Sequence, residues 1–347
     1  MRIALLNPPW YSESNPELWG VRAGSRWPHF QRRRAPGELP RYIPFPFFMA
    51  ISASALKQAG HEVLLIDGVA ENVFLYTVYN RITRFAPDLI FVETSTPSLG
   101  WDQRVMRELR ARLPKVMTVA GGTHAPTLVP QWLAANPVPD YWLAGEYETA
   151  LVELAGCLQR GQAPDNVPGF ISRTHVLAAP AHTPDVNALP QPLFDQLPMR
   201  NYGDPVCGLP SPVAQSWLSR GCPFGCTFCV WPQLIYGNHR YRERAIASAL
   251  DEVAHLIRKY ECESFYFDDD TANLGEARML ELASAIKARG LDQYPWSMMA
   301  RADCMTTPAI AALADAGLYS IKYGIESSSP ALVDACHKGT RLEAMLE

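Results

Sequence analysis

The chain has 347 residues, with 48% hydrophobic and 19% charged side chains, which is enough to bury two ordinary cores and predicts about two domains. Its net charge of -4 and pI near 6.1 give no basic footprint for nucleic acid, and the arginines at 32–34 are too few to supply one. No stretch approaches the roughly 20 apolar residues of a membrane span and no charged leader precedes the first apolar run, so we expect a cytoplasmic protein.

The first 160 residues alternate short apolar runs with stretches of helical periodicity. Near-continuous apolar runs are typical of strands buried on both faces of a parallel sheet, with right-handed helical crossovers between them. Residues 1–160 are therefore predicted to form a doubly wound, Rossmann-like α/β domain. The runs predicted to be strands are 3–6, 63–66, 89–92, 116–120 and 141–143.

Ligands of such sheets bind beyond the carboxyl ends of the strands, where the loops of this chain are rich in glycine and small hydroxyl residues. Gly121 and Gly122 alone would be weak evidence, because turn glycines are common. We expect His124 to hydrogen-bond within its loop rather than to bind a metal ion. The candidate binding residues at this edge are Pro8, Thr94, Ser95, Thr96, Ser98, Gly121, Gly122, Thr123, His124, Gly145 and Glu146.

Residues 161–213 differ in composition from the segments on either side, since they contain ten prolines and show no sustained hydrophobic periodicity. We predict a proline-rich linker whose role is to join two cores. The alternative is that residues 202–212 close over a substrate.

Three cysteines, Cys222, Cys226 and Cys229, follow an apolar run in the spacing CxxxCxxC. Thiolates are soft ligands that suit iron and sulfide, and three of them can hold three corners of a four-iron cluster. Such a cluster keeps one iron free to bind another molecule. The loop is short and contains two glycines and a proline, which supply the tight backbone that wrapping requires.

Two other interpretations of these cysteines are weaker. A zinc site usually has four nitrogen or sulfur ligands in paired spacing, and no second pair occurs in the chain. A disulfide framework is disfavoured because a long chain with a good core and no leader is expected in a reducing compartment. The remaining cysteines are interpreted as small apolar residues: Cys157, Cys207, Cys262, Cys304 and Cys336.

From residue 214 the alternation of strands and helices returns, and four βα units predict a partial TIM-type barrel over 214–347. Active residues of such barrels follow the strands, which selects Asp268, Arg301 and Glu326. Two of the three aspartates at 268–270 are expected to cap a helix in solvent, with Asp268 pointing inward. Arg301 could simply pair with Asp303, and Glu326 with a lysine. The predicted strands are 214–218, 264–267, 296–299 and 320–325, and the predicted helices are 245–259, 276–289, 308–316 and 330–337.

The cysteine spacing with an aromatic residue at Phe228 resembles the signature of the radical S-adenosylmethionine (SAM) enzymes. The resemblance implies that Cys222, Cys226 and Cys229 bind a 4Fe-4S cluster whose open iron chelates SAM. One electron, from a donor such as flavodoxin or ferredoxin, then cleaves SAM to methionine and a 5'-deoxyadenosyl radical. The residues that the resemblance places at SAM are Phe228, Asp268, Arg301, Glu326 and Ser327.

Three N-terminal segments are similar to the cobalamin-binding domain that precedes many radical SAM barrels: 7–9 (Asn-Pro-Pro), 121–124 (Gly-Gly-Thr-His) and 145–148 (Gly-Glu-Tyr-Glu). The resemblance implies that cobalamin lies across the candidate edge. The Asp-x-His-x-x-Gly motif that supplies an axial histidine to cobalt is absent. Cobalamin-dependent radical methylases often omit that histidine, and a domain that has lost cobalamin would omit it too; we expect cobalamin to be retained. Two further departures are the missing Gly-Gly-Glu after the second barrel strand and the end of the chain after four βα units. We therefore expect a truncated barrel.

The predicted function is radical methylation of an unactivated carbon in a small-molecule or lipid-like substrate. Radical rearrangement, cyclisation or oxidation without methyl transfer stays open. A non-catalytic cobalamin or iron-sulfur sensor is less favoured. A methylthiotransferase is disfavoured because such enzymes carry extra cysteines near the N-terminus, and the first 156 residues contain none.

Overall fold

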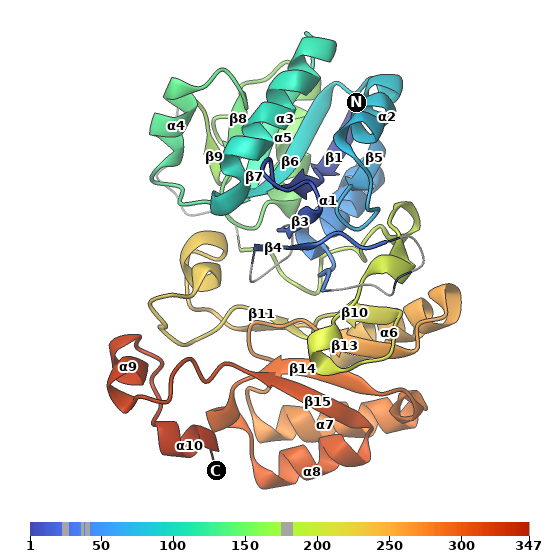
Figure 1. Ribbon diagram of the computed structural model, residues 1–347, viewed down its shortest axis with the longest axis vertical. Coiled ribbons are helices and arrows are strands. Elements are labelled where there is room, and N and C mark those ends of the chain that lie inside the picture. The colour runs from blue at the N-terminus through green and yellow to red at the C-terminus, as the bar shows by residue number, and fades with distance from the viewer. Residues whose placement is uncertain (23–27, 36–37, 39–41, 175–182, 347) are drawn as a thin grey trace.

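The structure is a computed structural model that describes residues 1–22, 28–35, 38, 42–174 and 183–346. Two α/β domains lie one above the other in Figure 1, the N-terminal domain in blue to green and the C-terminal domain in yellow to red. Among the described residues no helix is both long enough and apolar enough to cross a bilayer.

The N-terminal domain is built on a six-stranded sheet in the order β5-β1-β6-β7-β8-β9, in which β9 is antiparallel and the others are parallel. Its elements are β1 (Arg2–Asn7), α1 (Phe47–Gln58), β5 (Glu62–Asp67), α2 (Leu75–Phe85), β6 (Leu89–Ser95), α3 (Leu99–Arg112), β7 (Met117–Thr123), α4 (Val129–Ala135), β8 (Tyr141–Leu143), α5 (Glu148–Gln159) and β9 (Phe170–Ile171). Leu5 and Phe91 pack with α1 and α5, whereas Leu6 and Val92 pack with α2, α3 and α4. Helices on both faces confirm the predicted doubly wound sheet.

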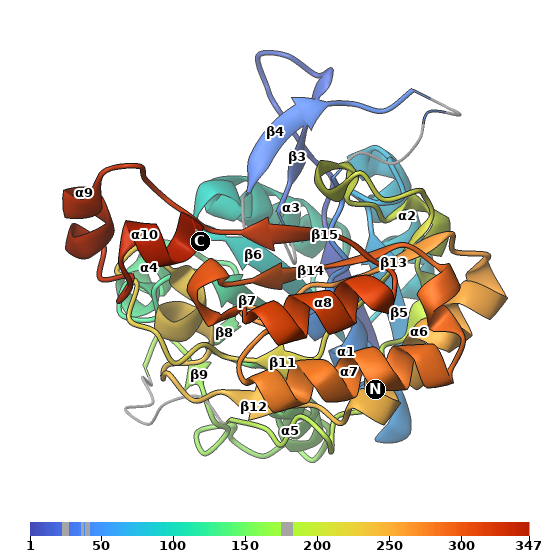
Figure 2. The same cartoon turned by 90° about the horizontal axis from the view of Figure 1, so that it is seen from below.

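A small antiparallel sheet interrupts the first crossover and was not predicted from the sequence. It contains β2 (Trp10–Tyr11), β3 (Leu18–Val21) and β4 (His29–Arg32), and in Figure 2 β3 and β4 project from the body. The ring of Trp10 packs directly on residue 20 and requires a glycine there, because a Cβ would lie 2.0 Å from a ring carbon of Trp10. The strands are too short and too aromatic to show a period of two, which is why periodicity missed them.

The C-terminal domain has a parallel sheet in the order β10-β13-β14-β15. Its elements are β10 (Val213–Ser216), β11 (Ser219–Arg220), β12 (Arg242–Glu243), α6 (Ile246–Tyr260), β13 (Ser264–Phe267), α7 (Glu276–Ala288), β14 (Trp296–Ala300), α8 (Thr307–Asp315), β15 (Leu318–Tyr323), α9 (Pro330–Ala335) and α10 (Leu342–Leu346). Figure 2 shows α7 and α8 in front of β13, β14 and β15. The predicted βα alternation is confirmed, but β15 lies two residues earlier than expected. It ends before Gly324, and Glu326 has a φ of 70° that turns the chain.

The described part of residues 161–213 packs against both sheets. The side-chain amide of Gln196 accepts from Leu65 N at 2.7 Å and donates to Val63 O at 3.0 Å, so it satisfies the free edge of β5. Asp204 pairs with Lys322 of β15 in the C-terminal domain. This segment therefore supports both cores as well as joining them.

Asp67, at the carboxyl end of β5, anchors the same segment to the N-terminal sheet. Its buried carboxylate accepts from the Tyr202 hydroxyl at 2.9 Å and from Asn7 Nδ2 at 2.8 Å. Burial, as the largest cause, raises the pKa of Asp67 to about 6. The pKa of an aspartate in the unfolded chain is about 4, so the folded state holds the Asp67 proton more tightly than the unfolded state.

We predict that Asp67 makes the fold less stable as pH rises from about 4 to about 6, because ionisation of the buried carboxyl costs about 3 kcal/mol. Asp67→Asn should remove this part of the pH dependence. Urea unfolding of both proteins between pH 4.5 and pH 7.5 measures the difference. The exposed Asp292→Asn variant is the control and should follow the wild type; equal slopes for Asp67→Asn and wild type would contradict the prediction.

Candidate functional site

The cysteine loop, residues 221–229, follows the carboxyl end of β10 by way of the short strand β11. Gly221 begins the loop with a φ of 88°, and a Cβ at this position would lie 2.0 Å from the carbonyl oxygen of Arg240. Only glycine fits such a position without moving the backbone. Gln233 closes the loop from the other side, because its amide donates to the carbonyl oxygens of Thr227 and Cys229, both at 3.0 Å.

The three predicted ligands are partly exposed free thiols on this loop. Cys222 Sγ lies 3.5 Å from the hydroxyl of Thr271. Within the described ranges, no three histidine, cysteine or acidic side chains are gathered closely enough for a single metal ion. In a 4Fe-4S cluster each thiolate binds a different iron, so the sulfur atoms stand further apart than in a mononuclear site. The soft donor set and the open loop therefore fit the cluster.

Arg301, predicted at SAM, lies beneath the cysteine loop. Its guanidinium is 3.5 Å from the centroid of the Phe224 ring, a cation–π contact within the loop. It also pairs with Asp303, at 3.0 and 2.7 Å, and donates to the Lys338 carbonyl at 3.0 Å. The pair with Asp303 expected as the alternative is present, but it is buried rather than at the surface.

The segment that follows β15 lies against the cysteine loop as well, since Thr227 N donates to the carbonyl of Cys336 at 3.0 Å. Glu326 accepts from Lys338 Nζ at 3.2 Å. The hydroxyl of Ser327 accepts from the amide of residue 329 at 3.0 Å. Arg301 therefore contacts the loop directly, through Phe224, and Lys338 links Glu326 to Arg301. Phe228 remains 51% exposed.

The three aspartates after β13 correct one expectation. Two of them were expected to be solvated helix caps, but Asp269 is buried and accepts from Leu218 N at 3.0 Å. Asp270 accepts from Gly221 N at 2.9 Å. Between β10 and the cysteine loop these amides have no strand partner, so carboxylates satisfy them instead.

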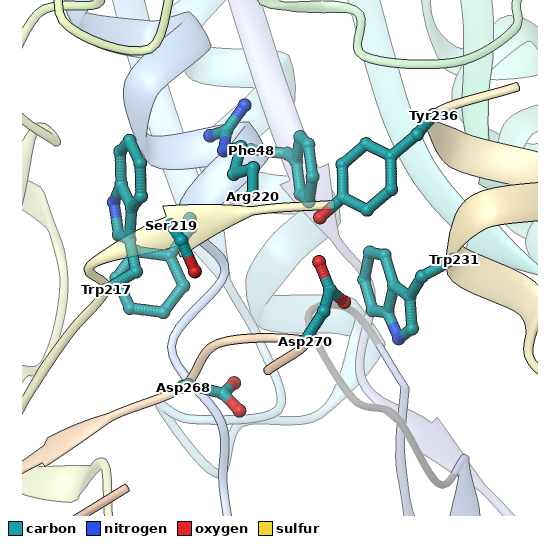
Figure 3. Close-up of a pocket in the computed structure, with 9 residues that line it drawn as sticks. Phe48, Trp217, Ser219, Arg220, Trp231, Tyr236, Asp268 and Asp270 are labelled. Atoms are coloured by element: carbon teal, nitrogen blue, oxygen red, sulfur yellow. The ribbon is translucent and has the colours of Figure 1, made fainter. Parts of the chain in front are cut away.

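A pocket lies where the two domains meet (Figure 3). Rings from α1 and from the residues around the cysteine loop form its walls, and Asp268 and Asp270 line it. Figure 3 shows the Tyr236 hydroxyl and the Asp270 carboxylate pointing toward each other. The space between these walls is about 30 Å³, room for a few water molecules, so a substrate-sized ligand requires the walls to move. The lining residues are Phe47, Phe48, Trp217, Ser219, Arg220, Trp231, Tyr236, Asp268 and Asp270.

Three of the hydroxyl residues predicted at the cobalamin edge are committed to a buried network. Arg22, which follows β3, pairs with Asp102 of α3, and both side chains are fully buried. Ser98 accepts from Arg22 and donates to Asp102, both at 2.8 Å. Thr94 donates to Asp102 as well, and Ser95 contacts Ser98 at 3.0 Å. Sequence reasoning missed Arg22 and Asp102, since neither lies in a motif.

The outer part of the same edge is more accessible. Thr96 is exposed, donates to the Thr123 carbonyl at 3.0 Å and lies 3.2 Å from His124 Nδ1. Burial lowers the pKa of His124, so its ring is neutral near pH 7. Gly122 has a φ of 127°, and a Cβ there would lie 2.1 Å from the carbonyl oxygen of Thr94. The close approach of β7 to β6 therefore requires glycine at this position.

Glu146 turns away from the edge toward the C-terminal domain. Its carboxylate contacts Arg220 at 2.9 Å and Arg242 at 2.7 Å. The remaining predicted edge residues are buried, namely Pro8 after β1, Gly121 within β7 and Gly145 after β8.

Two protein families match this chain. The B12 binding domain matches residues 41–155, which include most of the candidate edge, and the radical SAM superfamily matches residues 218–347, which include the cysteine loop. Domains of these families imply cobalamin, SAM and a 4Fe-4S cluster. The predicted set of cofactors is therefore confirmed.

Several curated proteins are similar over most of the chain. An uncharacterized methyltransferase of Pyrococcus horikoshii is 29% identical over 85% of this chain and 63% of its own length. The anaerobic magnesium-protoporphyrin IX monomethyl ester cyclase of Rubrivivax gelatinosus is 24% identical over 99% of this chain and 58% of its own length. Hopanoid C-3 methylase of Methylococcus capsulatus is 26% identical over 71% of this chain and 46% of its own length. This chain thus spans less than two thirds of each relative.

Two solved structures share the fold. The radical SAM methyltransferase TsrM from Kitasatospora setae gives a TM-score of 0.69 at 17% identity, over 99% of this chain and 64% of TsrM. The cobalamin-dependent SAM radical enzyme OxsB, with aqua-cobalamin and SAM bound, gives 0.72 at 17% identity, over 99% of this chain and 46% of OxsB. Both similarities support the arrangement of two α/β domains seen here.

We predict that Gly221→Ala sharply lowers the iron and sulfide bound after anaerobic reconstitution. The added Cβ collides with the Arg240 carbonyl, and the left-handed backbone costs of order 1–3 kcal/mol for a non-glycine residue. Gly225→Ala is the matched control in the same loop, because its Cβ would meet no atom within 4 Å. Iron and sulfide per chain, with circular dichroism to verify folding, measure the effect. Equal cluster content in the two variants would show the prediction to be wrong.

Proposed function

Because this chain belongs to the radical SAM enzymes that carry a B12-binding domain, we propose that it transfers a methyl group from cobalamin to an unactivated carbon. The observation that carries this proposal is the shared pocket. Phe47 and Phe48 reach it from the cobalamin-binding domain, and Ser219 and Arg220 reach it from β11, directly before the cysteine loop. A carbon held there would face both cofactors.

We assign Cys222, Cys226 and Cys229 as the cluster ligands. When bound, the cluster and SAM supply a radical that removes a hydrogen atom from carbon, and cobalamin supplies the methyl group. The protein holds the reactants and excludes water. Trp217 and Trp231, on opposite walls of the pocket, exclude water. Water exclusion and firm positioning both matter, because solvent or a loosely held substrate would divert a radical to side reactions.

SAM would lie along the residues that surround the loop. Asp268 and Asp270 offer carboxylates to its amino group, and Arg301 holds the ring of Phe224 in place beneath the loop. Phe228 and Val230, 51% and 38% exposed, form an apolar patch beside the cysteines. Such a patch is suited to the adenine of SAM, or to an electron donor such as flavodoxin or ferredoxin.

Cobalamin would lie on the edge of the N-terminal sheet. Thr96 and Thr123 present polar groups there, and Gly122 lets β7 approach the Thr94 carbonyl of β6 closely. His124, neutral and bonded to Thr96, would help to hold cobalamin as part of this loop rather than bind cobalt.

The substrate we propose is a small or lipid-like molecule. Hopanoid C-3 methylase is named for a lipid substrate, and the aromatic walls of the pocket suit an apolar carbon skeleton. The second candidate function is radical cyclisation or oxidation without methyl transfer, which the similarity to anaerobic magnesium-protoporphyrin IX monomethyl ester cyclases favours.

We predict that the chain reconstituted without oxygen, with iron, sulfide and hydroxocobalamin, converts SAM to 5'-deoxyadenosine when reduced, and retains corrin through gel filtration. Cys226→Ala should abolish 5'-deoxyadenosine, because the cluster loses one of three ligands. Cys157→Ala, on α5, is the matched control and should keep wild-type activity. Mass spectrometry of the nucleoside and the absorption spectrum of the corrin provide the measurements. Intact cluster and corrin without SAM cleavage would favour a sensor instead.

A further inference from the structure

Four buried charges meet where the two domains join. Arg220 Nη1 lies 2.9 Å from Glu146 and 2.7 Å from Glu148, and Arg242 Nη2 lies 2.7 Å from Glu146. The glutamates belong to the N-terminal domain, Glu146 in the loop after β8 and Glu148 at the start of α5, and the arginines belong to the C-terminal domain. None of the four side chains is more than 12% exposed. We name these residues the junction cluster.

The two arginines and the two glutamates of the junction cluster would each be an unfavourable pair of like charges if the other pair were absent. Arg220 and Arg242 are direct partners in the antiparallel pair β11–β12, so two positive charges stand side by side. Glu146 and Glu148 would likewise be two buried negative charges. Buried charges are tolerated when they are paired and strongly destabilising when one partner is removed. The charges of the arginines and the glutamates are therefore neutralised only when the two domains are correctly docked.

The junction cluster is attached to both cofactor-binding loops through very short stretches of chain. Arg220 lies two residues before Cys222, and Gly221 between them is held by Asp270. Glu146 directly follows Gly145 of the cobalamin edge. The guanidinium of Arg220 also packs over the ring of Phe48, at 4.4 Å, in the wall of the pocket. A shift of this arginine would move the cysteine loop against the cobalamin edge.

We propose that the junction cluster is a positioning element that fixes the distance between cobalt and the iron-sulfur cluster. This proposal rests on the proposed function, since both cofactors must be bound for the distance between them to matter. Arg220 and Glu146 act through the loops that they hold and take no part in the chemistry. Methyl transfer needs this element because a carbon must be reached from both sides in one bound orientation.

The test is a distance measurement in the holoenzyme. Cob(II)alamin and the reduced 4Fe-4S cluster are both paramagnetic, so pulsed electron paramagnetic resonance can record the dipolar coupling between them. Wild type should show one narrow distance distribution. Glu146→Gln and Arg220→Lys should each retain both cofactors but broaden the distribution, because a neutral amide or a single ammonium cannot replace the two-sided pairing.

The matched control is Glu252→Gln. Glu252 pairs with Arg244 at 2.8 Å, and this pair is as deeply buried but lies within the C-terminal domain. The variant should lose stability and keep the wild-type distance distribution. A wild-type distribution in both junction variants, or an equal broadening in Glu252→Gln, overturns the proposal.

A second readout needs no cofactor. Hydrogen exchange of the β11–β12 amides should be about tenfold faster in Glu146→Gln than in wild type, and unchanged there in Glu252→Gln. Unchanged exchange in Glu146→Gln also overturns the proposal. Failure of wild type to bind corrin or cleave SAM would instead count against the proposed function, so the two failures are distinguishable.

Discussion

Carboxylates that accept backbone amide hydrogens are the interaction on which the site depends. The amides of Leu218 and Gly221, on either side of the short strand β11, are buried and would be unsatisfied without side-chain acceptors. Asp269 and Asp270, from the end of the neighbouring strand, accept from them. These two hydrogen bonds hold the backbone that leads into the three cysteines. The acidic run after β13 is thus part of the scaffold of the loop as well as of the pocket.

The same dependence extends to the interface between the domains. The pocket has walls from both domains, so its shape exists only while they are docked in one orientation. Apolar contacts such as the stacked rings of Phe48 and Trp231, 5.9 Å apart, supply attraction but tolerate sliding. Buried ion pairs across the interface do not tolerate such sliding, because it would separate the partners and leave buried charges uncompensated. Arg220 and Glu146 thus add orientation to an interface that rings alone would leave loose.

The sequence was informative where a pattern reports one local property. The runs at 141–143 and 264–267 predicted β8 and β13 to the residue, because strands buried on both faces must be apolar throughout. The cysteine spacing located the loop for a similar reason, since ligand chemistry fixes residue type and separation. Arg22 with Asp102, and Arg220 with Glu146, were missed because each pair joins residues more than 70 positions apart. No periodicity or motif encodes which partner a charge will find.

The buried network of Arg22 changes how the cobalamin edge must be understood. Thr94 and Ser98 resemble ligand-binding hydroxyls in sequence, yet both donate to Asp102. A hydroxyl donates one hydrogen, so what these two can offer cobalamin is acceptance through lone pairs. Thr96 likewise donates its one hydrogen, to the Thr123 carbonyl, so it too can offer a ligand only its lone pairs. The ribbon of β2, β3 and β4, which delivers Arg22, thereby shapes an edge that it was not predicted to touch.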